Sequence, residues 1–470
     1  MAIIHEKKWK IFFLVATSIF MSTLDSSIVN IALPYMMKDL QTHIQAIQWV
    51  VLIYLVTVSA LLLTFGRLSD IKGRRPVYVM GFTVFVAGSL LCGLAGNTFF
   101  LIFSRSIQGF GAAMLMACSP ALLVDAFPVQ ERGKALGMIG SVVAAGLTTG
   151  PVVGGILLQY LSWRYIFYIN IPIGIAAAVG GMVILRDIPS AGGSNEPMDI
   201  KGSVLLILVL SAFILFMTQL SKWGVFSLPS LSCAGTAILA GIGFAVNESR
   251  TPYPLFDMAL LKIRLFLFPV IGAALLFAAL FGIVFLMPFY LTYPCGFSAS
   301  KTGFIMIVPF LFLLIISPVS GILYDTFGSR RLCLTGMSVL MLSLVSLLTV
   351  QPSMGVLSLL WRMGLAGIGT ALYVSPNNTV IMGSIPPYRR GIASGAVATA
   401  RNIGMVMGVA LAGLIFSTSF STLTHGASLE NYTAVSEAFF LTSFRRAMMT
   451  GVVLSVMGIL VTLVRGTESK

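Results

Sequence analysis

Apolar runs long enough to cross a lipid bilayer follow one another along almost the whole chain of 470 residues. A helix needs about 20 apolar residues to cross a hydrocarbon core roughly 30 Å thick. The alternating ten-residue strands that build a membrane β-barrel are absent. With 57% hydrophobic and 9% charged residues, the composition is also far from that of a soluble domain. We therefore predict an all-α, polytopic membrane protein.

Hydropathy divides the chain into fourteen predicted membrane helices. They cover residues 10–33, 47–69, 76–95, 99–121, 134–160, 164–186, 202–221, 228–246, 265–292, 299–323, 332–350, 354–375, 391–417 and 446–465. The first run is too long for a cleaved signal peptide, so it is expected to be retained as a span. An even number of spans puts both termini on one side of the membrane. Most of the 29 Lys and Arg residues then lie on that same side, and the positive-inside rule predicts cytoplasmic termini. Arg445 and Arg446, at the outer mouth of the last helix, depart from this rule.

Three sequence motifs recur in the same order in the two halves of the chain. "GRLSDIKGRRP" (66–76) returns as "GILYDTFGSRR" (321–331), "RSIQGFGAAMLMACSP" (105–120) as "RMGLAGIGTALYVSP" (362–376), and "FPVQERGKALG" (127–137) as "IPPYRRGIASG" (385–395). Parallel repeats of six helices are one way in which transporters build alternating access around a site at the middle of the membrane. We therefore predict a six-helix bundle in residues 1–190, a second in 251–470, and two inserted linker helices in 191–250.

These motifs resemble those of the major facilitator superfamily, and within it the fourteen-helix drug:proton antiporters. Besides the repeated motifs, "GLTTGPVVGG" (146–155), "LDSSIVNIALP" (24–34) and "SWRYIFYINIPIG" (162–174) carry the resemblance. It implies a multidrug efflux protein of the bacterial inner membrane that confers antibiotic resistance. Such a protein exports lipophilic, including cationic, compounds in exchange for protons by alternating access. It also implies a monomer that contacts membrane lipids and needs no cofactor.

Asp25 is the one acidic residue that falls well inside a predicted span. An ionisable group within a membrane is costly and is a functional hypothesis by default. At ~1.5 Å per residue, Asp25 lies roughly 20 Å up the first helix, at a height similar to that of Arg105 on the fourth. Burial favours a protonated carboxyl group, whereas a nearby cation favours the ionised form. Proton and substrate would then compete for Asp25, although a static pair with Arg105 remains an alternative.

The repeated loop motif carries a candidate conformational latch at the cytoplasmic side. In the first half it comprises Gly66, Asp70, Gly73, Arg74, Arg75 and Asp125. Gly66 would permit close helix approach, and the two arginines would bind Asp70, Asp125 or lipid phosphates. Asp325 with Arg330 and Arg331 would form the matching latch of the second half. Simple positive-inside anchoring explains the arginines but not Asp70.

The fifth predicted helix carries a row of small residues. Its members are Gly146, Gly150, Pro151, Gly154 and Gly155. Glycines at every fourth position let another backbone come close, and the proline removes one backbone hydrogen bond and bends the helix. This arrangement suits a helix that rocks against the other half, or static packing. By family resemblance, the segment controls leak and the direction of antiport.

The remaining candidates concern the substrate cavity. They are Met114, Phe277, Phe281, Phe285, Arg362 and Arg401. Phenylalanine and methionine form an adaptable apolar lining, with cation-π attraction for charged substrates, but such rows also face lipid or core. Arg362 holds the repeat position of Arg105, and Arg401 matches a common arginine of the fourteen-helix branch. Each arginine could instead bind backbone carbonyls or lipid.

Several classes of function are disfavoured by the sequence. The basic residues are scattered, so a nucleic-acid partner is not expected. The three histidines lie outside the deep spans, and neither a metal-ligand cluster nor a phosphate-binding loop occurs, which argues against an enzyme or an ATP-driven pump. A proton-coupled or passive transporter of a lipid-like metabolite remains an alternative. So does a non-transporting membrane scaffold or sensor with a transporter fold.

Overall fold

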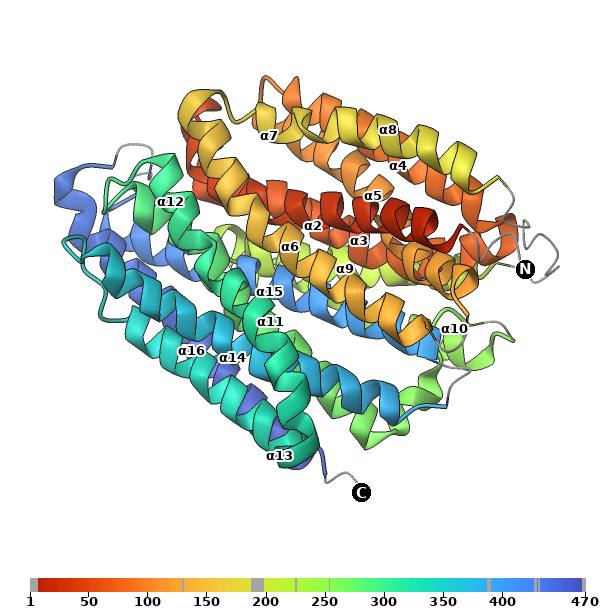
Figure 1. Ribbon diagram of the computed structural model, residues 1–470. Coiled ribbons are helices and arrows are strands. Elements are labelled where there is room, and N and C mark those ends of the chain that lie inside the picture. Colours follow the sequence, from red (N-terminus) through yellow and green to blue (C-terminus); the bar gives the residue numbers. More distant parts are fainter. Residues whose placement is uncertain are drawn as a thin grey trace.

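The computed structural model describes residues 7–128, 131–186, 198–224, 226–252, 254–386, 390–426, 429 and 432–466. Throughout these ranges the regular structure is helical, without a strand, which confirms the predicted all-α class. In Figure 1 the long helices lie side by side in one bundle, and both chain termini lie at the same end of it. We call this the terminal end. The helices α7 and α12 lie at the opposite end.

The first half contains six membrane-crossing segments. They are α2 (Lys8–Asp39), α3 (Ile44–Lys72), α4 (Arg74–Gly93), α5 (Thr98–Ala126), α6 (Arg132–Tyr160), and a sixth segment made of α7 (Tyr165–Tyr168) and α8 (Asn170–Ile184). Gly73 separates α3 from α4 with a φ of 93°, a backbone conformation that residues with a Cβ atom rarely adopt. Asn97 caps α5 by accepting a hydrogen bond from the Phe100 N–H at 2.8 Å.

Two further helices follow, α9 (Ile200–Trp223) and α10 (Leu228–Arg250). Each begins at a side-chain cap, Asp199 for α9 and Ser227 for α10. α9 contacts α3, α15 and α10, whereas α10 packs chiefly against α9. α9 and α10 therefore form a pair of helices at the side of the bundle.

The second half repeats the order of the first. Its elements are η1 (Met258–Lys262), α11 (Arg264–Thr292), α12 (Ala299–Met306), α13 (Val308–Leu347), α14 (Val356–Gly383), α15 (Arg390–Leu423), η4 (Ala434–Ser436) and α16 (Glu437–Val464). Gly328, the repeat equivalent of Gly73, breaks α13 with a φ of 73°. Thirteen described helices are long and apolar enough to cross a membrane, and the one from 299 to 347 has 49 residues. That length serves two crossings, so the described helices accommodate the fourteen predicted spans.

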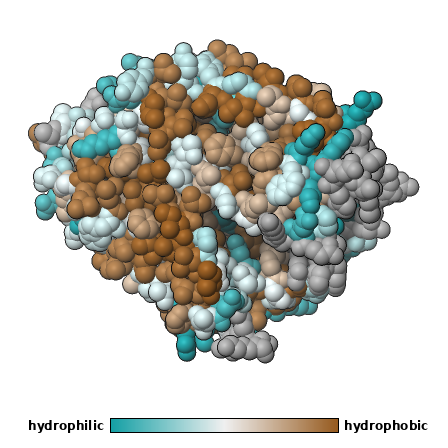
Figure 2. All heavy atoms as spheres, in the orientation of Figure 1, coloured by the Kyte–Doolittle hydropathy of each residue, from teal (hydrophilic) through white to brown (hydrophobic). Residues whose placement is uncertain are grey.

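The surface is apolar along the sides of the bundle. Figure 2 shows broad hydrophobic areas on the visible face. Large side chains such as Phe13, Phe103 and Leu239 are more than half exposed. Soluble monomers rarely expose so much contiguous apolar surface. The exposed apolar side chains along the bundle are therefore suited to contact with lipid.

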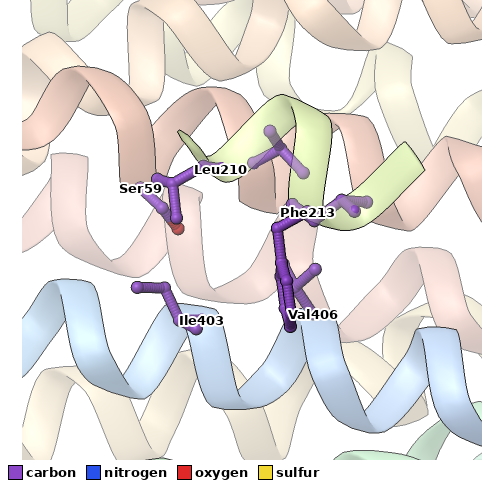
Figure 3. Close-up of a pocket in the computed structure, with 7 residues that line it drawn as sticks. Ser59, Leu210, Phe213, Ile403 and Val406 are labelled. Carbon is purple, nitrogen blue, oxygen red and sulfur yellow. The ribbon is translucent and has the colours of Figure 1, made fainter. Parts of the chain in front are cut away.

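Three contact zones join the two halves. α3 packs against α15, α6 against α12 and α13, and α2 against α11. α9 lies over the first zone: Figure 3 shows Leu210 and Phe213 of α9 pointing toward Ser59 of α3 and toward Ile403 and Val406 of α15. The inserted helix therefore contacts both halves at once.

Candidate transport site

Asp25 and Arg105 form an ion pair in the interior of the first half. The Arg105 Nη1 atom lies 2.5 Å from Asp25 Oδ2, and the two side chains are 0% and 1% exposed. Asp25 comes from α2 and Arg105 from α5, and the Arg105 Nε atom also donates to the Val50 carbonyl of α3 at 3.0 Å. Three helices thus fix the pair that the predicted heights of the two residues suggested.

Two amide side chains complete the surroundings of the Asp25 carboxylate. Gln108 donates from Nε2 to Asp25 Oδ1 at 2.8 Å and accepts at Oε1 from Arg105 Nη1 at 2.6 Å. Asn170, at the start of α8, donates to Asp25 Oδ1 at 3.4 Å. The sequence reasoning missed both residues. Gln108 lies three positions after Arg105, on the same helix face, and Asn170 is a polar residue within an apolar span, so both carried a readable signal.

Aromatic rings enclose the guanidinium group. The Arg105 Cζ atom lies 4.2 Å from the ring centroid of Tyr54 and 5.7 Å from that of Phe167. These rings exclude water and add cation-π attraction. Removing one partner of such a buried pair leaves an uncompensated charge, at a cost of about 3–5 kcal/mol. Neutralising Asp25 would therefore strongly destabilise the present packing of the three helices that hold the pair.

The first-half latch residues meet at the terminal end. Arg74 forms an ion pair with Asp125 and lies 3.6 Å from Asp70, and its Nη1 atom donates to the Ala121 carbonyl at 2.8 Å. Arg75 instead donates to the Met182 carbonyl of α8 at 3.0 Å. The predicted close approach at Gly66 is wrong for this structure, because a Cβ atom there would meet nothing within 4 Å.

The second-half motif is arranged differently. Arg330 donates to the Leu463 carbonyl of α16 at 2.7 Å. Asp325 and Arg331 are exposed, and within the described ranges neither forms an ion pair. The structure thus does not bring Asp325, Arg330 and Arg331 together.

The glycines of α6 face two neighbours. Cβ atoms added at Gly146, Gly150 and Gly154 would collide with Thr23, Ser27 and Ile28 of α2. A Cβ atom at Gly155 would lie 2.8 Å from the Ala299 carbonyl of α12, and a Cβ atom added at Gly303 of α12 would collide with the Pro151 carbonyl. α6 is therefore held against its own half by three glycines. At the end of the bundle opposite the termini, it contacts the other half through Pro151 and Gly155.

The candidate substrate residues are largely packed in the interior. Met114, Phe277, Phe281 and Phe285 are at most 8% exposed. Arg401 of α15 lies 5.9 Å from the Phe277 ring centroid, and its Nε atom is buried without a hydrogen-bond partner among the described residues.

Arg362 occupies its repeat position on α14 but turns toward backbone. Its Nε atom donates to the Ser346 carbonyl at 3.1 Å and its Nη1 atom to the Ser358 carbonyl at 2.8 Å, and the guanidinium carbon stacks 4.5 Å from the Trp361 ring. No described carboxylate pairs with it.

Comparison with known proteins identifies the class. The family model of the Major Facilitator Superfamily matches residues 15–409, and the chain belongs to this superfamily. It is therefore a multi-pass membrane transport protein rather than an enzyme.

The relatives that this chain resembles carry names of transport, export and drug resistance. The riboflavin transporter RibZ of Clostridioides difficile is 34% identical over 91% of this chain and 92% of the relative. The multidrug resistance protein Stp of Mycobacterium tuberculosis is 32% identical over 86% of this chain and 75% of its own. The tetracenomycin C resistance and export protein of Streptomyces glaucescens is 31% identical over 88% of this chain and 77% of the relative.

Solved structures share the fold at low identity. A bacterial homologue of the human lysosomal transporter Spinster, in an inward-facing and unoccupied conformation, has a TM-score of 0.69 at 13% identity and covers 98% of this chain and 97% of its own. An auto-inhibited peptide transporter of the POT family has a TM-score of 0.70 at 13% identity, with 98% coverage of both chains.

Proposed function

We propose that this transporter exports lipophilic, amphipathic compounds, cations included, across the bacterial inner membrane in exchange for protons. The observation that carries the proposal is the fully buried Asp25, paired with Arg105 and hydrogen-bonded by Gln108. The names of relatives such as the multidrug resistance protein Stp support export of drug-like compounds. The basic residues favour cytoplasmic termini, so the terminal end would face the cytoplasm.

Proton coupling follows from the charge balance of the site. With Asp25 ionised, the carboxylate satisfies Arg105 and Gln108, and the three helices are held together. Protonation removes the negative charge and leaves the guanidinium group buried without its counter-ion, which is unfavourable. Helices α2, α3 and α5 would then rearrange, and substrate release outward would accompany proton entry. Substrate arriving from the cytoplasm would favour loss of the proton.

The remaining candidate residues take supporting roles in this proposal. Arg74, Asp70 and Asp125 would close the cytoplasmic end in one state and separate in the other. Pro151 and Gly155 would hold α6 against α12 near the outer surface while the inner side exchanges substrate. Phe277, beside Arg401, would contribute to the substrate wall once the halves separate.

The test is transport by the purified protein in proteoliposomes with an imposed pH gradient and a panel of dyes and antiseptics. We expect gradient-driven flux with the wild type and its loss in Asp25→Asn. The matched control is Asp39→Asn on the same helix. Asp39 also pairs with an arginine, Arg164, at 2.9 Å, but this ion pair is exposed to solvent. Equal flux by Asp25→Asn and wild type would refute proton coupling at Asp25. A wild type without flux of any compound would favour a scaffold or sensor.

A second candidate is transport of a metabolite rather than a drug. It is favoured by the riboflavin transporter, which matches nearly the full length of both chains. Including riboflavin in the same panel separates the two candidates. Saturable riboflavin flux that the dyes and antiseptics do not inhibit would favour the metabolite.

A further inference from the structure

A surface groove lies between the two inserted helices at the terminal end of the bundle. It has a volume of about 690 Å³. Its lining comes from the first turns of α9 and the last turns of α10: Ile200, Lys201, Val204, Leu205, Gly243, Val246, Asn247 and Arg250. Because both spans end here, the groove lies where the hydrocarbon core meets the headgroup region.

Two cations line this groove, and among the described residues neither has a counter-ion. Lys201 and Arg250 are both exposed, and among the described residues neither forms an ion pair or a side-chain hydrogen bond. The neighbouring acids are turned inward: Asp199 and Glu248 are 8% and 3% exposed. The positive charges of the groove are therefore available to an external anion.

Both acids accept local hydrogen bonds. Asp199 accepts from the Gly202 N–H at 2.8 Å and from Asn247 Nδ2 at 2.6 Å. Glu248 accepts from the Phe256 N–H at 2.9 Å. These bonds tie the two carboxylates to the backbone and to Asn247, and they explain why the acids do not pair with Lys201 or Arg250.

Apart from Asn247, the rest of the groove lining is apolar. Ile200, Val204 and Val246 are 64%, 48% and 45% exposed. Gly243 contributes no side chain, and a Cβ atom placed there would lie 3.3 Å from Leu205. An apolar hollow with cations at the headgroup level matches a molecule that has an anionic head and a hydrocarbon tail, and it does not match free phosphate.

We propose that the α9–α10 groove is a binding site for an anionic glycerophospholipid. The phosphate group interacts with Lys201 and Arg250, and one acyl chain lies along Val204 and Val246 over Gly243. Two basic residues at the headgroup level favour an anionic lipid over a zwitterionic one by more than about tenfold. The site gives the inserted helices a ligand of their own, independent of the transport substrate.

The test is native mass spectrometry of the full-length protein in detergent, titrated with dioleoylphosphatidylglycerol or dioleoylphosphatidylcholine. We expect at least one phosphatidylglycerol molecule to be retained with roughly tenfold or greater preference over phosphatidylcholine. Lys201→Ala/Arg250→Ala should remove that preference. Gly243→Leu, which fills the hollow and keeps both charges, should weaken binding of phosphatidylglycerol.

The control variant is Lys10→Ala/Arg186→Ala, which removes an exposed lysine and an exposed arginine from the first half. It should retain the lipid as the wild type does. Equal loss in this control and in Lys201→Ala/Arg250→Ala would overturn the proposal, because the effect would then reflect net charge. Undiminished binding by Gly243→Leu would also overturn it, as would displacement of the lipid by millimolar inorganic phosphate alone. A thermal unfolding curve for each variant confirms that the folded protein is being measured.

Discussion

Arg105 and Arg362 hold equivalent positions in the two halves, yet their surroundings differ in kind. Arg105 faces a buried carboxylate and the amide of Gln108. Arg362 faces the carbonyls of Ser346 and Ser358 and the ring of Trp361. Among the described residues, a titratable anion therefore accompanies the arginine of the first half and not that of the second. The duplicated helix motif determines the position of the arginine. The partners of the arginine determine whether binding of a proton can change the net charge around it.

Replacing each arginine in turn is expected to give the largest difference in stability and flux between the two halves. Arg105→Met leaves Asp25 buried without a counter-ion, so it should destabilise the protein by about 3–5 kcal/mol and abolish gradient-driven flux. Arg362→Met should lower stability by about 1–3 kcal/mol through unsatisfied carbonyls and leave flux largely intact. Thermal unfolding and proteoliposome flux measure the two effects. Equal loss of flux in both variants would contradict the comparison.

A double variant tests whether the first-half pair is the source of that loss. Asp25→Asn/Arg105→Met removes both charges, and it should recover about 1–3 kcal/mol of the stability lost in Arg105→Met, because no isolated charge remains buried. Flux should stay absent, since the titrating group is gone. Unfolding of all three variants under one condition gives the interaction energy, and a double variant no more stable than Arg105→Met would argue against the pair.

A glycine comparison extends the test to helix packing. In α15, Gly404 and Gly408 contact the backbone of Ala274 and Ala278 in α11, just as Gly146 and Gly150 of α6 meet α2. The Cβ of Gly408→Ala would collide with backbone, so we expect a loss of about 1–3 kcal/mol.

Gly150→Ala should cost less, because the Ser27 hydroxyl that its Cβ would meet can rotate, and the nearest backbone atom, the Ile28 nitrogen, lies 3.0 Å from that Cβ. Gly137→Ala, where nothing lies within 4 Å, is the control for helix propensity. Thermal unfolding in one detergent ranks the three variants. A larger loss in Gly150→Ala than in Gly408→Ala would reverse the expected ranking.

The smallest effect on stability is expected at the two loop motifs. Arg74 and its acids are partly exposed, so Arg74→Ala should cost only about 0.2–1 kcal/mol. Its flux should nevertheless fall, because the proposed latch depends on that ion pair. Arg330→Ala removes a single bond to a backbone carbonyl and should leave flux near that of the wild type. Initial rates across the same pH gradient decide this, and a greater loss in Arg330→Ala would place the latch in the second half.

Much of the fold could be predicted from the sequence because span length and the repeat are one-dimensional signals. The similar heights of Asp25 and Arg105 could also be read from the sequence, but their pairing depended on both residues facing inward, which the family resemblance supported. For Arg362 the sequence left open whether the side chain binds substrate, backbone carbonyls or lipid, because the carbonyls of Ser346 and Ser358 become available only through the packing of α13 on α14. Asn170 was missed because its proximity to Asp25 depends on how α8 packs against α2.

The glycine row shows the same limit. Its four-residue spacing in α6 was visible in the sequence, but its neighbours were not. The spacing could not reveal that Gly155 faces α12 while Gly154 faces α2. Gly404 and Gly408 carry the equivalent spacing in the second half, and their contact with α11 likewise became visible only in the structure.

The position of α9 has a thermodynamic consequence for the transport cycle. Leu210 and Phe213 cover the seam between α3 and α15 with nondirectional apolar contacts (Figure 3). Any movement that opens this seam must exchange some of that contact for contact with lipid chains. The energy difference between the two states of the transporter then contains a contribution from the bilayer itself. Membrane thickness and acyl-chain order therefore become variables of the conformational equilibrium, alongside the proton gradient.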